Sequence, residues 1–420
     1  MNEISALLRA VVNREEPSSW LGSLDNIRQE RSTMMNLLES GEVVYGFSTR
    51  LGQFDHSPVA DFEAELLKDH LVGNRFNLPG SFLRLVAAVK LAQLSCGGSA
   101  ISPELYNVIR GFVVRGDDRP ASGAWVDSYG AADVVPGAWW LRTVLQDAQA
   151  DLQRGDFIAA ASGSFFSTAV AIVAVSELDV FLASYMSFMP PVDHRLWRES
   201  RSSRESRVQR LMEGGSDRRH TQLPISARDC SPFVSAAMAA SDGVLTGIHR
   251  RINEVSANPL ISTRDVPSVL SQNSFLDFEL SAALVKAREF VFVALQHLQR
   301  IAERSFAEDA KPANVQRPKV VQAVVERAHL LMGTISYSSA QSGGVEDMYD
   351  MSLSASMHLI LLTRLGNRIV ALLNQWQPPF RQTNDLLNAL ALDGESSVDA
   401  ELLHTWSEQL LAGWIGLADT

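Results

Sequence analysis

The chain has 420 residues and a formal net charge of −11, with 46% hydrophobic and 20% charged residues. This composition can bury a large core, which excludes a disordered or fibrous chain. The acidic balance argues against a nucleic-acid partner, because phosphate contacts need a basic face.

The ends and the cysteines give no targeting or metal signal. The N-terminal run MNEISALLRAVVN lacks a basic region followed by an apolar one, and we expect no segment of the 18 or so apolar residues that would span a membrane. Cys96 and Cys230 belong to no metal-binding spacing. We therefore expect a cytoplasmic protein without a metal site or a membrane segment.

The first third of the chain mixes short strand-like runs with helical ones. Residues 41–47 and 111–114 are the two strand-like runs, and both are short. Apolar residues then recur at three- and four-residue spacing, which predicts helices, in segments 82–94, 170–183, 282–301 and 357–373. Some of these segments are apolar on nearly every side, so other helices must surround them.

This pattern predicts a mainly α protein in two parts. Residues 1–150 form a small α+β N-terminal region, and residues 151–420 form a bundle of long helices. The bundle core is expected to be shared between subunits, so we predict an oligomer.

Irregular segments interrupt the helices at 73–79, 117–136, 213–232, 257–267 and 338–344. Segments this long in a compact helical body are commonly functional or flexible. The arginine-rich run 195–219 is interrupted by acids and rich in serine, which is typical of a solvated loop and not of a binding arm.

Read in order, several of these segments resemble the signature loops of the aromatic amino acid lyase and aminomutase family, which includes histidine, phenylalanine and tyrosine ammonia-lyases. The similar runs are YGFSTRLG at 45–52, LKDHLVG at 67–73, GGSAI at 97–101, NEVSANPL at 253–260 and QSGGVEDMYDMS at 341–352. The resemblance covers roughly residues 40 to 355. It implies a long-helix bundle of the ammonia-lyase/fumarase-like type and a homotetramer whose active sites are built from several chains.

The family's electrophile, a methylidene-imidazolone (MIO), forms from an Ala-Ser-Gly triplet that is missing here. The corresponding run, 127–136, reads DSYGAADVVP. Ala132 has no hydroxyl to lose by dehydration, and one residue is absent where the serine and the glycine should both stand. We therefore expect no MIO and no other cofactor.

The resemblance implies three catalytic residues. Tyr45 matches the family tyrosine that removes a substrate proton as a phenolate, and Arg50 is a candidate for lowering its pKa. His70 matches a residue that lines the substrate pocket, and Glu346 could orient a substrate amine or shuttle a proton. Each has an alternative: Tyr45 could simply pack at a strand end, His70 could cap a helix, and acids after glycines are often helix N-terminal charges.

Five more residues are candidates for substrate binding. Tyr129 precedes the lost triplet and could stack on a flat substrate or fill the vacated space, as could the nearby tryptophans 125, 139 and 140. Asp133 is expected to face the electrophile's former site and to carry protons. Ser162 replaces the family's supporting asparagine, and Asn258 lies in a segment near the family's active centre.

The fifth candidate depends on an alignment that the residues leave open. Counting forward from Gln222 puts Arg228 on the family's carboxylate-binding arginine, whereas counting back from Pro232 puts Asp229 there.

Two functions fit these residues. The first is an enzyme without MIO that performs acid–base chemistry, namely elimination, isomerisation or cyclisation, on a specialised amino-acid-like or aromatic small molecule, for instance in natural-product biosynthesis. The alternative is a pseudoenzyme that acts as a scaffold or completes the site of an intact lyase. Retention of polar pocket residues favours the enzyme, because unused buried polar groups cost stability.

Overall fold

The computed structural model describes residues 2–16, 22–57, 63–215, 222–263, 266–333, 338–341, 346–392 and 400–416. The α-helices are α1 Asn2–Asn13, α2 Leu24–Glu39, α3 Glu63–Asp69, α4 Gly80–Ser95, α5 Pro103–Arg115, α6 Val134–Ala148, α7 Asp156–Ala161, α8 Phe165–Ser187, α9 Ser203–Met212, α10 Ser231–Ile252, α11 Phe278–Glu308, α12 Arg317–His329, α13 Ser352–Asn374, α14 Thr383–Leu390 and α15 Ala400–Trp414. The 3-10 turns are η1 Gly52–Phe54, η2 His194–Leu196, η3 Ile225–Ala227 and η4 Pro312–Asn314. The strands form antiparallel pairs: β1 Phe76–Leu78 with β2 Ala121–Gly123, β3 Leu260–Ser262 with β4 Ser268–Leu270, and β5 Ser338–Gln341 with β6 Glu346–Met348.

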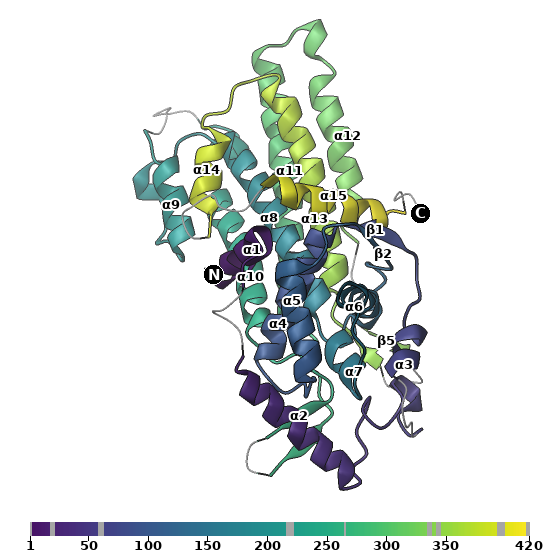
Figure 1. The fold of residues 1–420 in the computed structure, drawn as a ribbon. Coiled ribbons are helices and arrows are strands. Elements are labelled where there is room, and N and C mark those ends of the chain that lie inside the picture. The colour runs from purple at the N-terminus through teal and green to yellow at the C-terminus, as the bar shows by residue number, and fades with distance from the viewer. Residues whose placement is uncertain are drawn as a thin grey trace.

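Helix α8 lies at the centre of the fold (Figure 1). Its residues are apolar around most of the circumference, so it has no face that favours water. Helices α4, α10, α13, α14 and α15 pack around it and bury nearly the whole helix. The mainly α bundle predicted from the sequence is confirmed.

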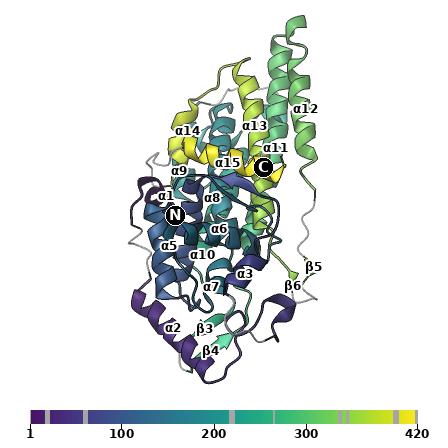
Figure 2. The ribbon, with the colours of Figure 1, turned by 45° about the vertical axis from the view of Figure 1, so that its right-hand side comes forward.

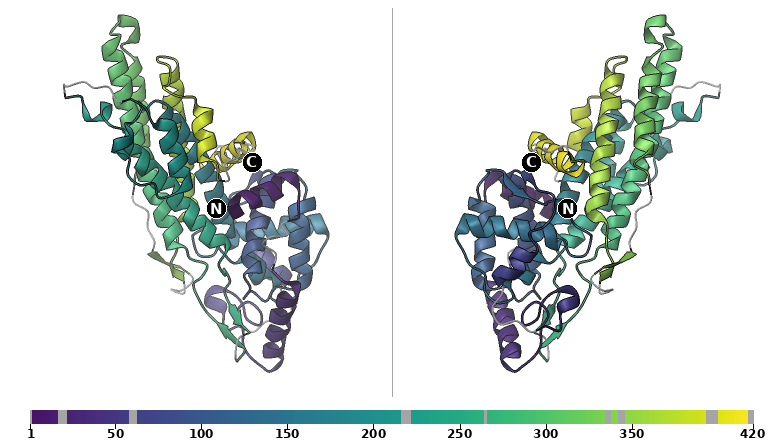
Figure 3. Two further views of the ribbon diagram at one scale, coloured as in Figure 1. Left: turned by 90° about the vertical axis from the view of Figure 1, so that its left-hand side faces the viewer. Right: turned by 90° about the vertical axis from the view of Figure 1, so that its right-hand side faces the viewer.

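The long helices form one arm of the molecule. Helix α11 packs along both α10 and α13, and it turns back into α12 as a hairpin that extends beyond the rest of the fold (Figure 3). The predicted helical segments 170–183, 282–301 and 357–373 lie inside α8, α11 and α13.

The N-terminal elements cover the other side of α8. Helix α4, which contains the predicted segment 82–94, packs against α1, α5, α8 and α10. The predicted strand at 111–114 is wrong, because this run lies inside α5. Ser102 caps that helix, and Leu105, Ile109 and Phe112 bury one helical face at three- and four-residue spacing. The strand-like run at 41–47 forms a turn, and the β3–β4 pair lies against α2 (Figure 2).

Two helical segments, 156–187 and 352–374, are long and apolar enough to cross a membrane. The expectation that no segment is long and apolar enough to span a membrane is therefore wrong. All of the most apolar window in the first segment and 56% of that in the second are buried inside the protein. The apolar character of the first segment follows from its position in the bundle core, where every side meets another helix.

Close packing of α8 against α13 depends on Gly366. A Cβ atom at this position would lie 2.3 Å from the Phe181 ring and 3.0 Å from Leu295. We expect Gly366→Ala to lower the free energy of unfolding by about 1–3 kcal/mol, because the rigid ring must move. Denaturant unfolding at fixed protein concentration measures the change.

Gly243→Ala is the matched control on α10, where the nearest atom to the added Cβ is 4.0 Å away. It should leave stability unchanged or raise it by up to about 1 kcal/mol, since alanine is the better helix former. Equal effects of the two substitutions would contradict this account of the α8–α13 contact.

Candidate active site

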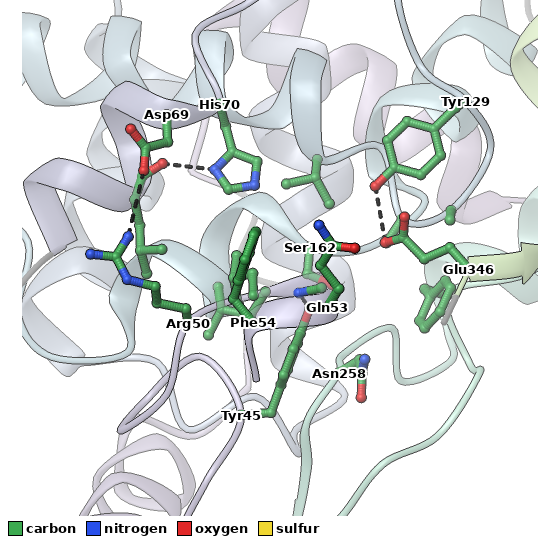
Figure 4. A pocket seen from close by; sticks show the side chains of 18 residues that line it. Tyr45, Arg50, Gln53, Phe54, Asp69, His70, Tyr129, Ser162, Asn258 and Glu346 are labelled. Carbon is green, nitrogen blue, oxygen red and sulfur yellow. Dashed lines mark hydrogen bonds and ion pairs between the residues drawn. The ribbon is translucent and has the colours of Figure 1, made fainter. Parts of the chain in front are cut away.

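A cavity of about 320 Å³ lies where several loops converge at one end of the bundle (Figure 4). Six of the residues predicted from the sequence line it: Tyr45, His70, Tyr129, Ser162, Asn258 and Glu346. They come from six separate places: the loop after α2, the end of α3, the loop before α6, the α7–α8 turn, the loop after α10 and the start of β6. The fold therefore collects residues that are up to 301 positions apart in the printed sequence.

Tyr45 faces the cavity with its hydroxyl oxygen accepting a hydrogen bond from the backbone N–H of Gly52, at 3.1 Å. Burial raises the pKa of Tyr45, and the negative charge of Glu346 adds to this effect, while the Gly52 N–H opposes it. The prediction that Arg50 lowers the pKa of Tyr45 is wrong. Its guanidinium lies 3.6 Å from Glu65 and 4.0 Å from Asp69, and so pairs with acids of α3.

His70 follows α3, where it both caps the helix and lines the cavity. Its Nδ1 lies 2.7 Å from the carbonyl oxygen of Leu66, so it caps the end of the helix. Because a carbonyl only accepts, this contact places a proton on Nδ1, and in the neutral imidazole Nε2 is then the acceptor. The ring also contacts Phe157, with the ring centroids 5.0 Å apart, and it lines the cavity.

Tyr129 and Glu346 meet on the opposite wall of the cavity (Figure 4). The Tyr129 hydroxyl donates to Glu346 Oε1 at 3.1 Å. Burial and the Glu346 charge raise the pKa of Tyr129, so this hydroxyl is a donor and not a base. The two loops are also joined through the backbone, where Asp350 N–H donates to the Gly130 carbonyl at 3.1 Å.

Asp133 does not line the cavity, so the expectation that it faces the electrophile's former site is wrong. The side chain is 2% exposed. Its carboxylate accepts hydrogen bonds from the Ser167 N–H and hydroxyl, at 2.8 and 2.6 Å, and from the Ser128 hydroxyl at 2.9 Å. Burial raises the pKa of Asp133, and these donors oppose the rise. Asp133 therefore anchors the loop to the first turn of α8.

Arg228 and Asp229 lie outside the cavity of their own chain, so the carboxylate contact expected from either alignment stays a prediction. The exposed Arg228 side chain donates from Nε to the Leu223 carbonyl at 2.6 Å. Asp229 accepts from the Ser231 N–H and hydroxyl, at 2.9 and 2.6 Å, which caps the start of α10.

The remaining candidates have smaller roles. Asn258 lines the cavity, and its Oδ1 lies 3.5 Å from the Gln272 backbone nitrogen. Core packing accounts for the three tryptophans, because each indole is largely buried and donates to a backbone carbonyl: Trp125 to Phe76, Trp139 to Val72 and Trp140 to Leu83.

Lys90 supports the site in a way that the sequence does not indicate, since it stands in an apolar helix. Its fully buried Nζ donates to the Ser162 carbonyl at 2.6 Å and lies 4.8 Å from the centre of the Phe165 ring. Burial and the positive charge of Arg251 lower the pKa of Lys90 to about 7. Within the part of the chain that the structure describes, no group of three or more His, Cys, Asp or Glu side chains is arranged to hold a metal ion.

Comparisons with known proteins show what the chain is similar to. The sequence model for aromatic amino acid lyases matches residues 4–116. The histidine ammonia-lyase of Paracidovorax citrulli is 23% identical over 333 residues, which cover 68% of this chain and 64% of that enzyme. Over these residues the chain is similar to the aromatic amino acid lyase family.

Solved structures share the fold over almost the whole chain. Ergothionase from Treponema denticola, an ergothioneine-degrading enzyme, superposes with a TM-score of 0.71 at 13% identity and covers 98% of this chain and 97% of its own. Tyrosine aminomutase from Streptomyces globisporus gives a TM-score of 0.70 at 14% identity, with 99% and 96% covered.

The residues of this chain that correspond to the family's electrophile position do not fit MIO formation. Ala131 and Ala132 line the cavity with methyl groups, and neither has a hydroxyl to dehydrate. The Ala132 carbonyl accepts from the Gly163 N–H at 3.1 Å. Ala132 and Asp133 both have left-handed backbone, with φ of 72° and 46°, a strained state that the Asp133 anchor holds.

Glu63 fixes His70's helix to the rest of the site. Its carboxylate accepts from the N–H groups of Gly155 and Phe157, at 2.5 and 2.7 Å, at the start of α7. Burial raises the pKa of Glu63 to about 7 from an ordinary value of 4.5. The protonated form is therefore favoured by folding, and its contribution is complete below pH 4.5 and lost as the pH rises through 7.

We expect Glu63 to lower the free energy of unfolding by on the order of 3 kcal/mol between pH 5 and pH 8. Glu63→Gln removes the titration, so stability measured by denaturant unfolding should depend less steeply on pH than in the wild type. Glu104→Gln, an exposed acid on α5, is the control and should keep the wild-type slope. If Glu63→Gln keeps that slope as well, Glu63 does not titrate as described.

Proposed function

We propose that this chain is an enzyme of the lyase family that works without MIO and performs acid–base chemistry on a specialised amino-acid-like or aromatic small molecule. The observation that carries the proposal is that Tyr45, His70, Tyr129 and Glu346 surround one cavity, while Ala131 and Ala132 offer only methyl groups there. The shared fold with an ergothioneine-degrading enzyme and an aminomutase supports chemistry beyond a standard ammonia-lyase reaction.

Tyr45 is the proposed base. In an elimination, its oxygen takes the proton from the substrate C–H bond, the electron pair of that bond forms the new double bond, and the leaving group departs with its own bonding pair. Ammonia is a poor leaving group without an electrophile to activate it. The substrate must therefore carry a better leaving group, or else isomerise or cyclise without losing one.

Residues around Tyr45 have supporting roles in this proposal. The Gly52 N–H stabilises the phenolate, and Nε2 of His70 is available to accept a substrate hydrogen bond. Tyr129 and Glu346 orient the substrate from the opposite wall. A homotetramer, a cytoplasmic location and a place in natural-product biosynthesis are further parts of the proposal.

A second function stays open because Arg228 lies outside the cavity of its own chain. A subunit that contributes loops to the site of an intact lyase would not need a complete site of its own. This alternative predicts that the chain alone turns over no substrate.

The base is tested with Tyr45→Phe in a screen of candidate substrates. We expect kcat to fall by about 10²- to 10⁴-fold, the usual contribution of a general base. The rate of the wild type should rise with pH through neutrality, because the pKa of Tyr45 is raised and the phenolate fraction grows with pH. Tyr106→Phe is the matched control, since Tyr106 is bonded to Ser95 in the core of the N-terminal region. Unchanged turnover in Tyr45→Phe would exclude Tyr45 as the base.

The absence of MIO is tested on the purified chain. Cyclisation and dehydration expel water, so a chain without MIO has the mass of its sequence, no near-ultraviolet shoulder and no sensitivity to borohydride or cyanide. A mass deficit that matches the loss of water, together with borohydride sensitivity, would overturn the proposal.

A further inference from the structure

The walls of the cavity are mainly aromatic. Tyr45, Phe54, His70, Tyr129 and Phe275 all line it, and Figure 4 shows the first four arranged around the open space. Phe54 and Tyr129 are 54% and 37% exposed, unlike the buried tryptophans of the core. These rings are therefore not needed to fill the interior, and their exposed faces are available to a ligand.

The charge of the cavity is negative. The lining holds one cationic side chain, Arg50, and two carboxylates, Asp69 and Glu346, so its formal charge is −1. Arg50 is paired with Asp69 and with Glu65 outside the lining, which leaves Glu346 as the carboxylate that Arg50 does not neutralise. Glu346 accepts the hydrogen bond of the Tyr129 hydroxyl at 3.1 Å, and its charge raises the pKa of both Tyr129 and Tyr45. A negatively charged ligand would be repelled here, and a positively charged one attracted.

The Tyr129–Glu346 hydrogen bond strengthens this preference. Donation of the phenol hydrogen to a carboxylate increases the electron density of the ring. An electron-rich ring face beside a carboxylate is the arrangement that binds ammonium groups by cation–π attraction, as in aromatic cages for quaternary ammonium ligands. The volume of about 320 Å³ suits a small organic cation.

We propose that this cavity is an aromatic cage and that the substrate is an ammonium compound, quaternary or fully alkylated, held by its positive charge between Tyr45, Phe54, Tyr129 and Glu346. The inference rests on the proposed function, because it names the substrate class of the same site. A cation in the cage also stabilises the phenolate of Tyr45, so substrate binding would itself activate the base.

The test compares probes of one shape and different charge. Choline and tetramethylammonium are titrated into the full chain by calorimetry at constant ionic strength, with 3,3-dimethylbutan-1-ol as the neutral counterpart of choline. We expect choline to bind at least about tenfold more tightly than the neutral alcohol, the usual size of a desolvated cation–π contribution. Equal affinity of the two, or no binding of either cation to the folded chain, would overturn the cage.

Substitutions in the cavity wall test whether choline binds at this site. Phe54→Leu removes an exposed ring without opening the core, so it should fold and weaken choline binding by about fivefold or more, and Glu346→Gln should do the same by removing the charge. Tyr129→Phe keeps the ring and should bind more tightly than Tyr129→Leu. Phe380→Leu, at a 61% exposed phenylalanine outside the cavity, is the control. Wild-type affinity in Phe54→Leu and Glu346→Gln together would contradict the proposal.

The binding test separates the two proposals, because it needs no turnover. Charge-selective binding of choline in a chain whose activity does not depend on Tyr45 would support the cage and overturn the acid–base function. Turnover that depends on Tyr45, without charge-selective binding, would support the function and overturn the cage.

Discussion

The first turn of α8 lies buried in the middle of a helix bundle, and its backbone N–H groups need acceptors that water cannot supply there. Asp133 accepts from the Ser167 N–H, and the Ser256 hydroxyl accepts from the Ser164 N–H. Because α8 is apolar and enclosed, these acceptors must come from loops that approach its end. The cavity is formed by those same loops, so its walls follow from the hydrogen-bonding needs of the central helix.

Further buried carboxylates connect the first turn of α8 to the long helices α11 and α13. Asp277 caps α11 through the Leu280 N–H, and Asp350 caps α13 through the Ser352 N–H while also accepting from the Asp277 N–H. The backbone of Asp350 is in turn bonded to Gly130, beside Tyr129. Burial raises the pKa of Asp350 to about 6, and the nearby charge of Asp133 contributes. The position of Tyr129 is thus set by the ends of three core helices.

The long helices could be predicted from the sequence because apolar spacing records burial directly, as it does for α8, α11 and α13. The run at 111–114 looked like a strand because it is short and β-branched, but a capped helix with a buried face overrode that preference.

The resemblance predicted that six residues form one site, and all six line the cavity: Tyr45, His70, Tyr129, Ser162, Asn258 and Glu346. Asp133 and Arg228 could not be placed that way, since their orientation depends on which backbone N–H or carbonyl lies within reach. Lys90 and Glu63 had no signal, because a charged residue in an apolar run gains its role only from the partners that folding brings to it.

The walls of the cavity differ in how much change they tolerate. Ser162 and Ala132 lie beside buried anchors that also cap or support core helices, so a substitution there disturbs the whole bundle. The short turn η1, with Gln53 and Phe54, lies at the surface and packs few core atoms. During evolution, new ligand preferences can therefore arise by drift in this turn at little cost to folding, while the opposite wall stays constant. This turn is therefore the part of the cavity wall through which the protein can adapt to new compounds.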